Sequence, residues 1–148
     1  MVRELSPDAI EAFLHEEVIA RVAYVDMRGR PGLVTIAYAY DGRSLFGYSM
    51  LGAKLDAMSQ NPYVCIGVDR VDDAANWRTV LVRGVFEPLA GDAARSAVEM
   101  IAERLRTVAH AETASTGAGR TYVEREGGIG IAYRVRITER HGRWSVSA

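Results

Sequence analysis

Residues 44–58 read SLFGYSMLGAKLDAM, and this stretch decides how the chain folds. A short apolar strand ends at Ser49, small residues form a turn, and apolar residues then repeat at helical spacing, which predicts a helix over 51–60. Lys54 lies beside the apolar stripe of that helix, and it is the only lysine in the chain. A serine hydroxyl, free N–H groups at a helix start and one ammonium group can together hold a phosphate. The stretch therefore predicts an anion site, with a solvated helix cation as the alternative role for Lys54.

Strand patterns lie on both sides of this stretch. Ser6 and Pro7 are typical of a helix start, and Asn61-Pro62 ends the central helix because the residue before proline avoids the α region. A turn at His141-Gly142 separates the last two predicted strands. The predicted strands cover 20–26, 33–40, 44–49, 63–70, 77–86, 129–137 and 143–146, and the predicted helices cover about 6–17, 51–60 and 92–109.

The excess of strands over helices predicts a mainly β fold. The strands are too many and the helices too few for regular β-α-β units, so a small closed or split barrel with helices outside fits best. A chain of 148 residues with 49% hydrophobic residues predicts a single domain over residues 1–148. Residues 110–128 show no regular period and are expected to form a long excursion.

Composition also limits the classes of partner. The net charge is −1 and no block of basic residues occurs, which argues against nucleic acid and anionic membranes as partners. The apolar runs have only the length of strands, and the first residues are charged, so a cytoplasmic location is expected. The single cysteine, Cys65, predicts a buried and inert thiol.

Common catalytic motifs are missing from the sequence. Its three histidines are scattered, without a further ligand at the spacing that a metal site requires, so no metal centre is predicted. No G-x-S-x-G elbow, Walker phosphate loop or G-x-G-x-x-G motif before a helix occurs. Hydrolases with such a nucleophile and enzymes with such a nucleotide loop are therefore disfavoured.

Four segments in order carry a resemblance to a known family. They are RPGLVTIAY at 30–38, LFGYS at 45–49 followed by GAKL at 52–55, NPYVC at 61–65, and WRTVLVRG at 77–84. Together they resemble the pyridoxamine 5'-phosphate oxidase-like FMN-binding split barrels, and residues 133–144 are similar to the nitroimidazole-resistance branch. The resemblance implies a six-stranded antiparallel split β-barrel and a homodimer with FMN at the subunit interface. It also implies an FMN-dependent oxidoreductase acting on a small molecule, in which no catalytic side chain is assigned.

The resemblance implies cofactor contacts from three segments. The strand at 33–36 matches the one that lines the flavin ring, the segment at 48–54 matches the phosphate site, and Thr79 matches a glutamine that touches the flavin. The oxidase branch has an arginine where this chain has Ala53, so authentic pyridoxamine-phosphate oxidation is not expected. The implied cofactor-binding residues are Leu33, Val34, Thr35, Ile36, Tyr48, Ser49, Lys54, Arg78 and Thr79.

Two alternatives remain open at this point. The same barrel can be a reductase that binds a deazaflavin coenzyme, whose acidic tail requires a basic groove. It can also be a non-enzymatic flavin or haem carrier, in which a histidine is the axial ligand of the haem iron. The candidate residues are Arg28, Arg30, Arg78 and Arg83 for the acidic tail, and His15, His110 and His141 for the haem.

Overall fold

The computed structural model describes residues 1–50, 52–112 and 130–147, with the backbone alone for 109–112. Leu51 and, from residue 113 onward, the excursion predicted over 110–128 lie outside the described residues. The strands are β1 (Val2–Glu4), β2 (Ile19–Val25), β3 (Pro31–Ala37), β4 (Ala39–Tyr40), β5 (Ser44–Met50), β6 (Tyr63–Val71), β7 (Trp77–Pro88) and β8 (Gly130–Ser145). The helices are α1 (Pro7–Glu16), α2 (Ala53–Gln60) and α3 (Gly91–Glu112).

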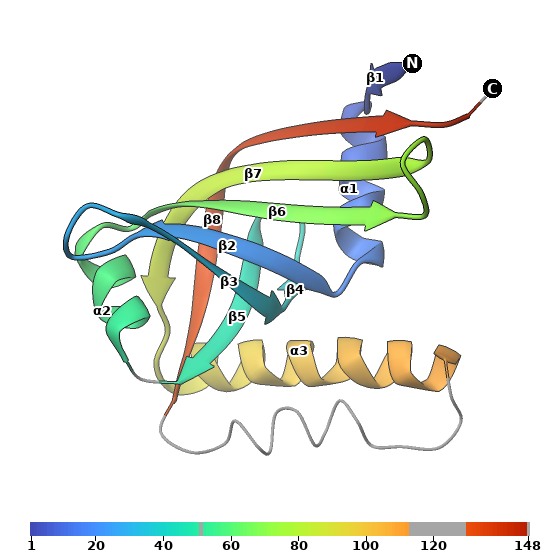
Figure 1. Ribbon diagram of the computed structural model, residues 1–148. Helices are drawn as coiled ribbons and strands as arrows, with labels where there is room; N and C mark the ends of the chain where they lie inside the picture. Colours follow the sequence, from blue (N-terminus) through green and yellow to red (C-terminus); the bar gives the residue numbers. More distant parts are fainter. Residues whose placement is uncertain (51, 113–129, 148) are drawn as a thin grey trace.

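The strands form one curled sheet. Every pair is antiparallel, in the order β3-β2-β6-β7-β8-β5-β4, and β1 adds to β8. The sheet bends into a half barrel with α2 at one end and α1 at the other (Figure 1). The predicted mainly β, antiparallel split barrel is confirmed. Strand β1 was not predicted, the strand predicted over 33–40 is divided into β3 and β4, and the two predicted over 129–137 and 143–146 are the single strand β8.

The last strand differs from the prediction. The turn expected at His141-Gly142 is wrong, because β8 runs unbroken from Gly130 to Ser145 and pairs with β7 along this region. Gly142 instead lets the side chains of Leu5 and Ile10 approach β8 closely, since a Cβ atom there would lie 2.8 Å from atoms of both. A glycine in a strand interior is typical of such contacts.

Two clusters of buried apolar side chains pack against the sheet, one on each side. Inside the half barrel, α1 contributes Phe13 and Leu14 and α2 contributes Leu55 and Met58 to the main core. Outside it, α3 covers β4, β5 and β8 with a smaller cluster around Ile101. The start of α1 is as predicted, because the N–H of Ala9 donates to Ser6 Oγ at 3.2 Å and Pro7 opens the helix. Within the described residues, no helix combines the length and apolarity needed to cross a lipid bilayer.

Candidate functional site

The end of β5 carries a buried hydroxyl. Ser49 is only 2% exposed, and its Oγ has no hydrogen-bond partner among the described residues. It alternates with Tyr48, so it faces the same side of β5 as the core residue Leu45. Leaving a buried hydroxyl unpaired costs roughly 1–3 kcal/mol. An external hydrogen-bonding group at this position would remove that cost.

The helix that follows begins without a cap. Gly52 occupies the N-cap position of α2 and no side chain bonds to the first turn, whereas Ser6 caps α1. The N–H groups of the first turn of α2 are therefore open to an acceptor. Lys54 lies in that turn, half-buried, without an ion pair or hydrogen bond to any described residue. Ser49, the first turn of α2 and Lys54 form one corner, called here the anion corner.

The anion corner has the chemistry of a phosphate site. Helix N-termini carry partial positive charge, and the Lys54 ammonium adds a full one. Asp56, in the same turn, is exposed and opposes this charge only from the solvent side. The corner therefore suits one anionic group that accepts hydrogen bonds from several donors.

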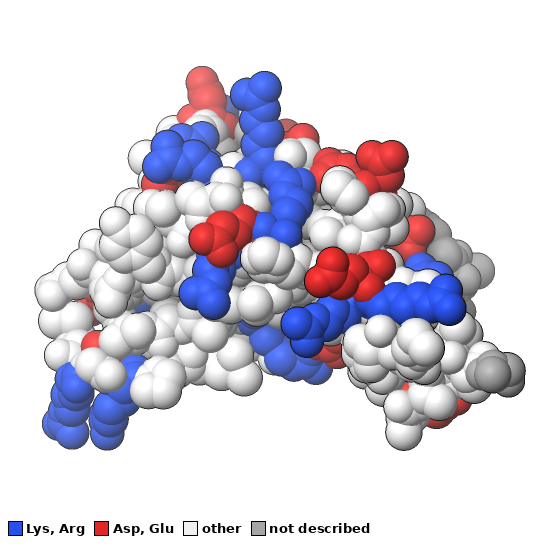
Figure 2. All heavy atoms as spheres, turned by 90° about the horizontal axis from the view of Figure 1, so that it is seen from above, with Lys and Arg blue, Asp and Glu red and all other residues white. Residues whose placement is uncertain are grey.

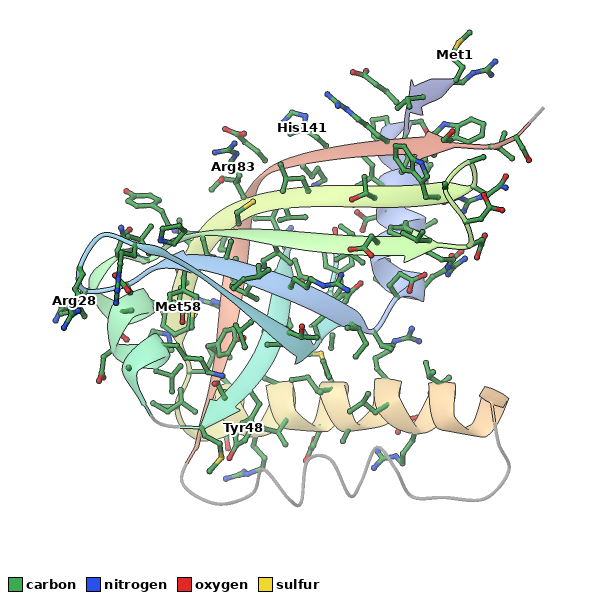
Figure 3. All side chains as sticks on the ribbon, viewed as in Figure 1. Met1, Arg28, Tyr48, Met58, Arg83 and His141 are labelled. Atoms are coloured by element: carbon green, nitrogen blue, oxygen red, sulfur yellow. The ribbon has the colours of Figure 1, made fainter. Side chains whose placement is uncertain are left out.

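Tyr48 faces away from the anion corner. It packs against the α3 side of the sheet, near the end of β5 (Figure 3). Its ring fills the space beside Gly130, where a Cβ atom would lie 2.4 Å from Tyr48 Oη. It also lines a groove of about 350 Å³ between α3 and β8. Tyr48 and Ser49 therefore serve opposite faces of one strand.

Strand β3 divides its four candidate residues between two faces. Val34 and Ile36 point to the main core, and Ile36 is 5% exposed. Leu33 and Thr35 point outward, and Leu33 is 68% exposed. Only the outward pair and the backbone are thus available to a ligand on the outer face.

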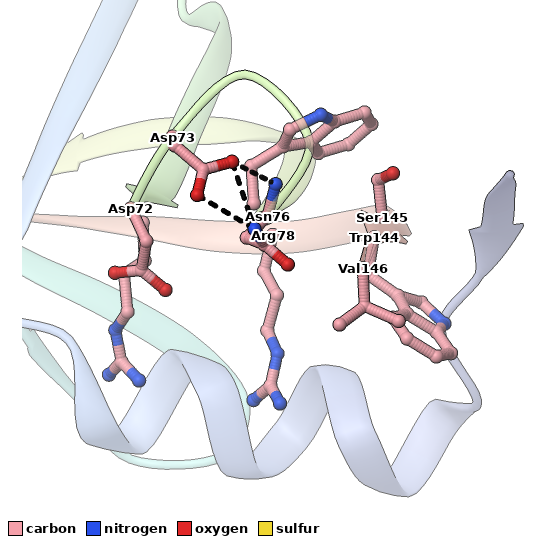
Figure 4. A pocket seen from close by; sticks show the side chains of 9 residues that line it. Asp72, Asp73, Asn76, Arg78, Trp144, Ser145 and Val146 are labelled. Carbon is pink, nitrogen blue, oxygen red and sulfur yellow. Dashed lines mark hydrogen bonds between the residues drawn. The ribbon is translucent and has the colours of Figure 1, made fainter. Parts of the chain in front are cut away.

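Arg78 and Thr79 also point to opposite faces. Alternation along β7 places Arg78 on the inner side with Val80, toward α1 (Figure 4), and Thr79 on the outer side. Both lie at the end of β7 that is remote from α2 (Figure 1). Within one chain, the structure therefore does not bring these two residues to the anion corner.

The arginines proposed for an acidic tail are dispersed. Arg30 Nε lies 3.0 Å from Asp26 Oδ2, and Arg83 Nε lies 3.7 Å from Glu139 Oε2. Hydrogen bonds from the backbone N–H groups of Arg30 and Arg28 hold the pKa of Asp26 below its usual value. Arg28 is at the tip of the β2–β3 hairpin, while Arg83 lies over the middle of the sheet (Figure 3). The four arginines do not line a single groove.

The histidines are equally scattered. The ring of His15 packs on Tyr40 with centroids 4.7 Å apart, and its Nε2 lies 3.5 Å from Glu11 Oε1. His141 is exposed on the outer face of β8, 3.7 Å from Glu139. The side chain of His110 lies outside the described ones.

The sequence reasoning missed one surface, the outer face of β2, β6 and β7. Tyr63 is 74% exposed and Leu81 is 38% exposed, and Cys65 lies between β2 and β7 at the same face. A groove of about 410 Å³ runs along it, lined in part by Tyr63, Cys65 and Arg83. The left of this face is largely uncharged, whereas charged groups gather over its centre and right (Figure 2). The alternation of Leu81 with buried Val80 and Val82 was the available signal.

Comparison with known proteins gives consistent results. The family model described as pyridoxamine 5'-phosphate oxidase matches residues 6–144. A FAD-binding protein of Mesorhizobium loti has 27% sequence identity and a TM-score of 0.70, covering 98% of this chain and 99% of that one. A FAD- and haem-binding protein of Mycobacterium smegmatis has 22% identity and a TM-score of 0.72, covering 96% of this chain and 72% of that one.

A curated relative is an uncharacterised protein of Rhizobium meliloti. It is 31% identical over 88 residues, which span 60% of this chain and 58% of the relative. The aligned segment is thus less than two thirds of that relative's length. Since the family model matches nearly the whole chain and the sheet has the split-barrel topology, the protein belongs to the pyridoxamine 5'-phosphate oxidase family.

Proposed function

We propose that the protein binds a flavin nucleotide, FMN, with its phosphate in the anion corner, and that it is an FMN-dependent oxidoreductase for a small molecule. The observation that carries the proposal is the unpaired Oγ of buried Ser49, next to the uncapped first turn of α2 and the unpaired Lys54. These three features meet the needs of a phosphate dianion, which accepts several hydrogen bonds and requires a counter-charge.

The bound flavin would supply the redox chemistry, and the protein would supply binding and orientation. Lys54 would neutralise phosphate charge, Ser49 would donate its hydroxyl hydrogen, and the first N–H groups of α2 would complete the cradle. The outward side of β3, with Leu33 and Thr35, would face the ring system. None of these roles requires a side chain that donates or accepts a proton during turnover.

A mononucleotide suits the anion corner better than a dinucleotide. The corner holds one cation, Lys54, among the described residues, and FMN carries one phosphate whereas FAD carries two. The Mesorhizobium loti relative binds FAD, which makes FAD the comparison ligand for FMN. For haem, the side chain of His15 packs on Tyr40, lies 3.5 Å from Glu11 and is 51% exposed, and that of His141 is 70% exposed, so neither is enclosed as an axial ligand would be.

A second copy of the chain would complete the site. The anion corner lies near α2, whereas Thr79 lies on the outer face at the opposite end of the sheet (Figure 1). One flavin can contact both only if they come from different subunits. The exposed apolar residues Tyr63 and Leu81 on the same outer face support a homodimer through this face.

Substitution of Lys54 tests the phosphate contact. In Lys54→Ala, FMN binding should weaken by about 10- to 100-fold, the range expected for loss of a charged hydrogen bond, while riboflavin binding should change little. Both affinities can be measured by quenching of flavin fluorescence. Arg95→Ala is the matched control, because it removes one exposed cation on α3 that pairs with Asp92.

Three results would contradict the proposal. One is an equal loss of FMN and riboflavin binding in Lys54→Ala, which would place the lysine away from the phosphate. Another is a similar loss of FMN binding in Arg95→Ala, which would indicate only a general effect of charge. The third is unmodified protein that takes up no flavin at millimolar FMN.

A further inference from the structure

A second groove lies between α1 and the end of the sheet that is remote from α2. It has a volume of about 490 Å³, within the range of small-molecule sites. One wall comes from the N-terminal arm and α1, and the other carries Arg78 and Trp144. The first wall combines apolar side chains with a serine and two carboxylates, namely Leu5, Ala9, Ala12 and Phe13 with Ser6, Glu4 and Glu16.

A row of side chains crosses four strands at this wall. Arg70, Arg78, Trp144 and Arg3 are successive partners in the register of β6, β7, β8 and β1. Arg70 lies over the ring of Phe13 at 5.7 Å, and Arg3 lies 5.8 Å from the centre of the Trp144 ring. Trp144 is therefore flanked by a cation on each neighbouring strand.

The carboxylates near this row leave two of its cations unpaired. Arg70 Nη2 lies 3.4 Å from Glu16 Oε2, and Arg70 also forms an ion pair with Glu17. Within the described chain, neither Arg78 nor Arg3 forms an ion pair. Arg78 stands directly opposite Arg70, and like charges in that position destabilise a sheet. An anion beside Arg78 would relieve this repulsion.

The loop beside the groove does not supply that anion. A neighbouring hollow of about 400 Å³ shares Arg78 and Trp144 and is bounded by the β6–β7 loop (Figure 4). In this loop, Asn76 Nδ2 donates a hydrogen bond to Asp73 Oδ2 at 2.7 Å. Asp72 makes no ion pair with Arg78 among the described contacts. Glu4 and Glu16 also line the groove, but Glu16 pairs with Arg70 and neither forms an ion pair with Arg78 among the described residues.

We propose that this groove binds a small aromatic carboxylate, with its carboxylate on Arg78 and its ring on Trp144. An arginine fork matches a carboxylate in geometry, and a flat ring can lie on the indole against the apolar side chains of α1. Arg3, on the other side of Trp144, adds a second positive charge. The site goes beyond the proposed flavin function and does not depend on it, since it uses none of the residues of the anion corner.

Trp144 offers a direct test, because the chain contains two tryptophans and Trp77→Phe leaves only Trp144. In this full-length variant, 4-nitrobenzoate should quench the indole emission to saturation. Arg78→Gln should weaken the apparent affinity by at least about tenfold, as expected for loss of a charged hydrogen bond. The neutral 4-nitrobenzamide should bind weaker by a similar factor to protein with Arg78 intact, a comparison that does not depend on how Arg78→Gln folds.

Arg143→Gln is the matched control. It removes the same charge from the residue before Trp144, which points to the opposite face of β8, and it should leave the affinity for 4-nitrobenzoate unchanged. The proposal is overturned by quenching that does not saturate, by equal affinity for the acid and the amide, or by an Arg78→Gln variant that binds as well as its parent. An equal loss in Arg143→Gln would also overturn it.

Discussion

At the scale of single residues, Tyr40 shows how one phenol joins three elements. Its hydroxyl donates to Glu11 Oε2 at 2.7 Å, and Arg140 Nη1 lies 2.8 Å from the same carboxylate oxygen and 2.7 Å from the Tyr40 oxygen. Burial, followed by the hydrogen bond to Glu11, raises the pKa of Tyr40 to about 12. The group thus fixes α1 to β4 and β8 in its protonated form.

This shift has a defined consequence for stability at alkaline pH. The unfolded pKa of tyrosine is about 10, so the folded state favours the neutral phenol. The contribution of Tyr40 is complete below pH about 10 and is lost as the pH rises through about 12. We expect the urea midpoint to fall less between pH 8 and pH 11.5 in Tyr40→Phe than in the unmodified protein.

The exposed Tyr63 provides the control for this experiment. Tyr63→Phe should lose stability with pH as the unmodified protein does, because that side chain is 74% exposed. Burial also raises the pKa of Tyr38, whose hydroxyl donates to the Leu14 carbonyl at 2.8 Å, so part of the alkaline loss should persist in Tyr40→Phe. An unchanged pH dependence in Tyr40→Phe would contradict the role given to Tyr40.

At the scale of elements, the pairing of β7 with β8 contains one irregularity. The register shifts between Arg83 and Gly84, and a Cβ atom on Gly84 would lie 2.5 Å from the Arg136 carbonyl oxygen. Because this oxygen belongs to the backbone, the strands themselves would have to move. Gly84→Ala should therefore lower the free energy of unfolding by about 1–3 kcal/mol, measured by urea denaturation.

A second glycine separates this contact from a general effect of alanine. Gly67 lies on the adjacent strand β6, and a Cβ atom there would meet nothing within 4 Å. Gly67→Ala should be neutral or slightly stabilising, because it reduces the freedom of the unfolded chain. Equal destabilisation by both substitutions would show that the close approach at Gly84 is not the cause.

The elements also differ in how well their sequences predict them. Ser6-Pro7 and Asn61-Pro62 define helix ends through local hydrogen bonding and sterics, so the start of α1 and the end of α2 were predicted within a residue. The turn predicted at His141-Gly142 was wrong because Gly142 is required by its close contact with Leu5 and Ile10, which are distant in sequence. The chemistry of the anion corner could be predicted from residue types, whereas the missing partner of Ser49 depends on the surrounding fold.

At the scale of the whole molecule, the outer face of the sheet determines whether the proposed site is complete. Leu81 lies on β7 between β6 and β8, at the centre of this face. A charge there would have to be desolvated in a dimer but would remain hydrated in a monomer. Leu81→Glu should therefore shift the protein toward monomer in light scattering after gel filtration, and FMN binding should weaken with it.

The distant strand β1 provides the control for this prediction. Val2 is 53% exposed, so Val2→Glu adds the same charge without burying it. It should leave both the mass in solution and FMN binding unchanged. A monomeric unmodified protein that binds FMN tightly would contradict the proposed interface, as would a Leu81→Glu variant that stays dimeric.

The long strand β8 has a consequence for how the chain folds during synthesis. It follows its partners β1, β5 and β7 in the chain and lies between β5 and β7 in the sheet order. Until residues 130–145 leave the ribosome, β5 and β7 each keep an unpaired edge, and such edges recruit other strands. Closure of the barrel is therefore a late event, and nascent chains that stall before β8 are the form most exposed to aggregation.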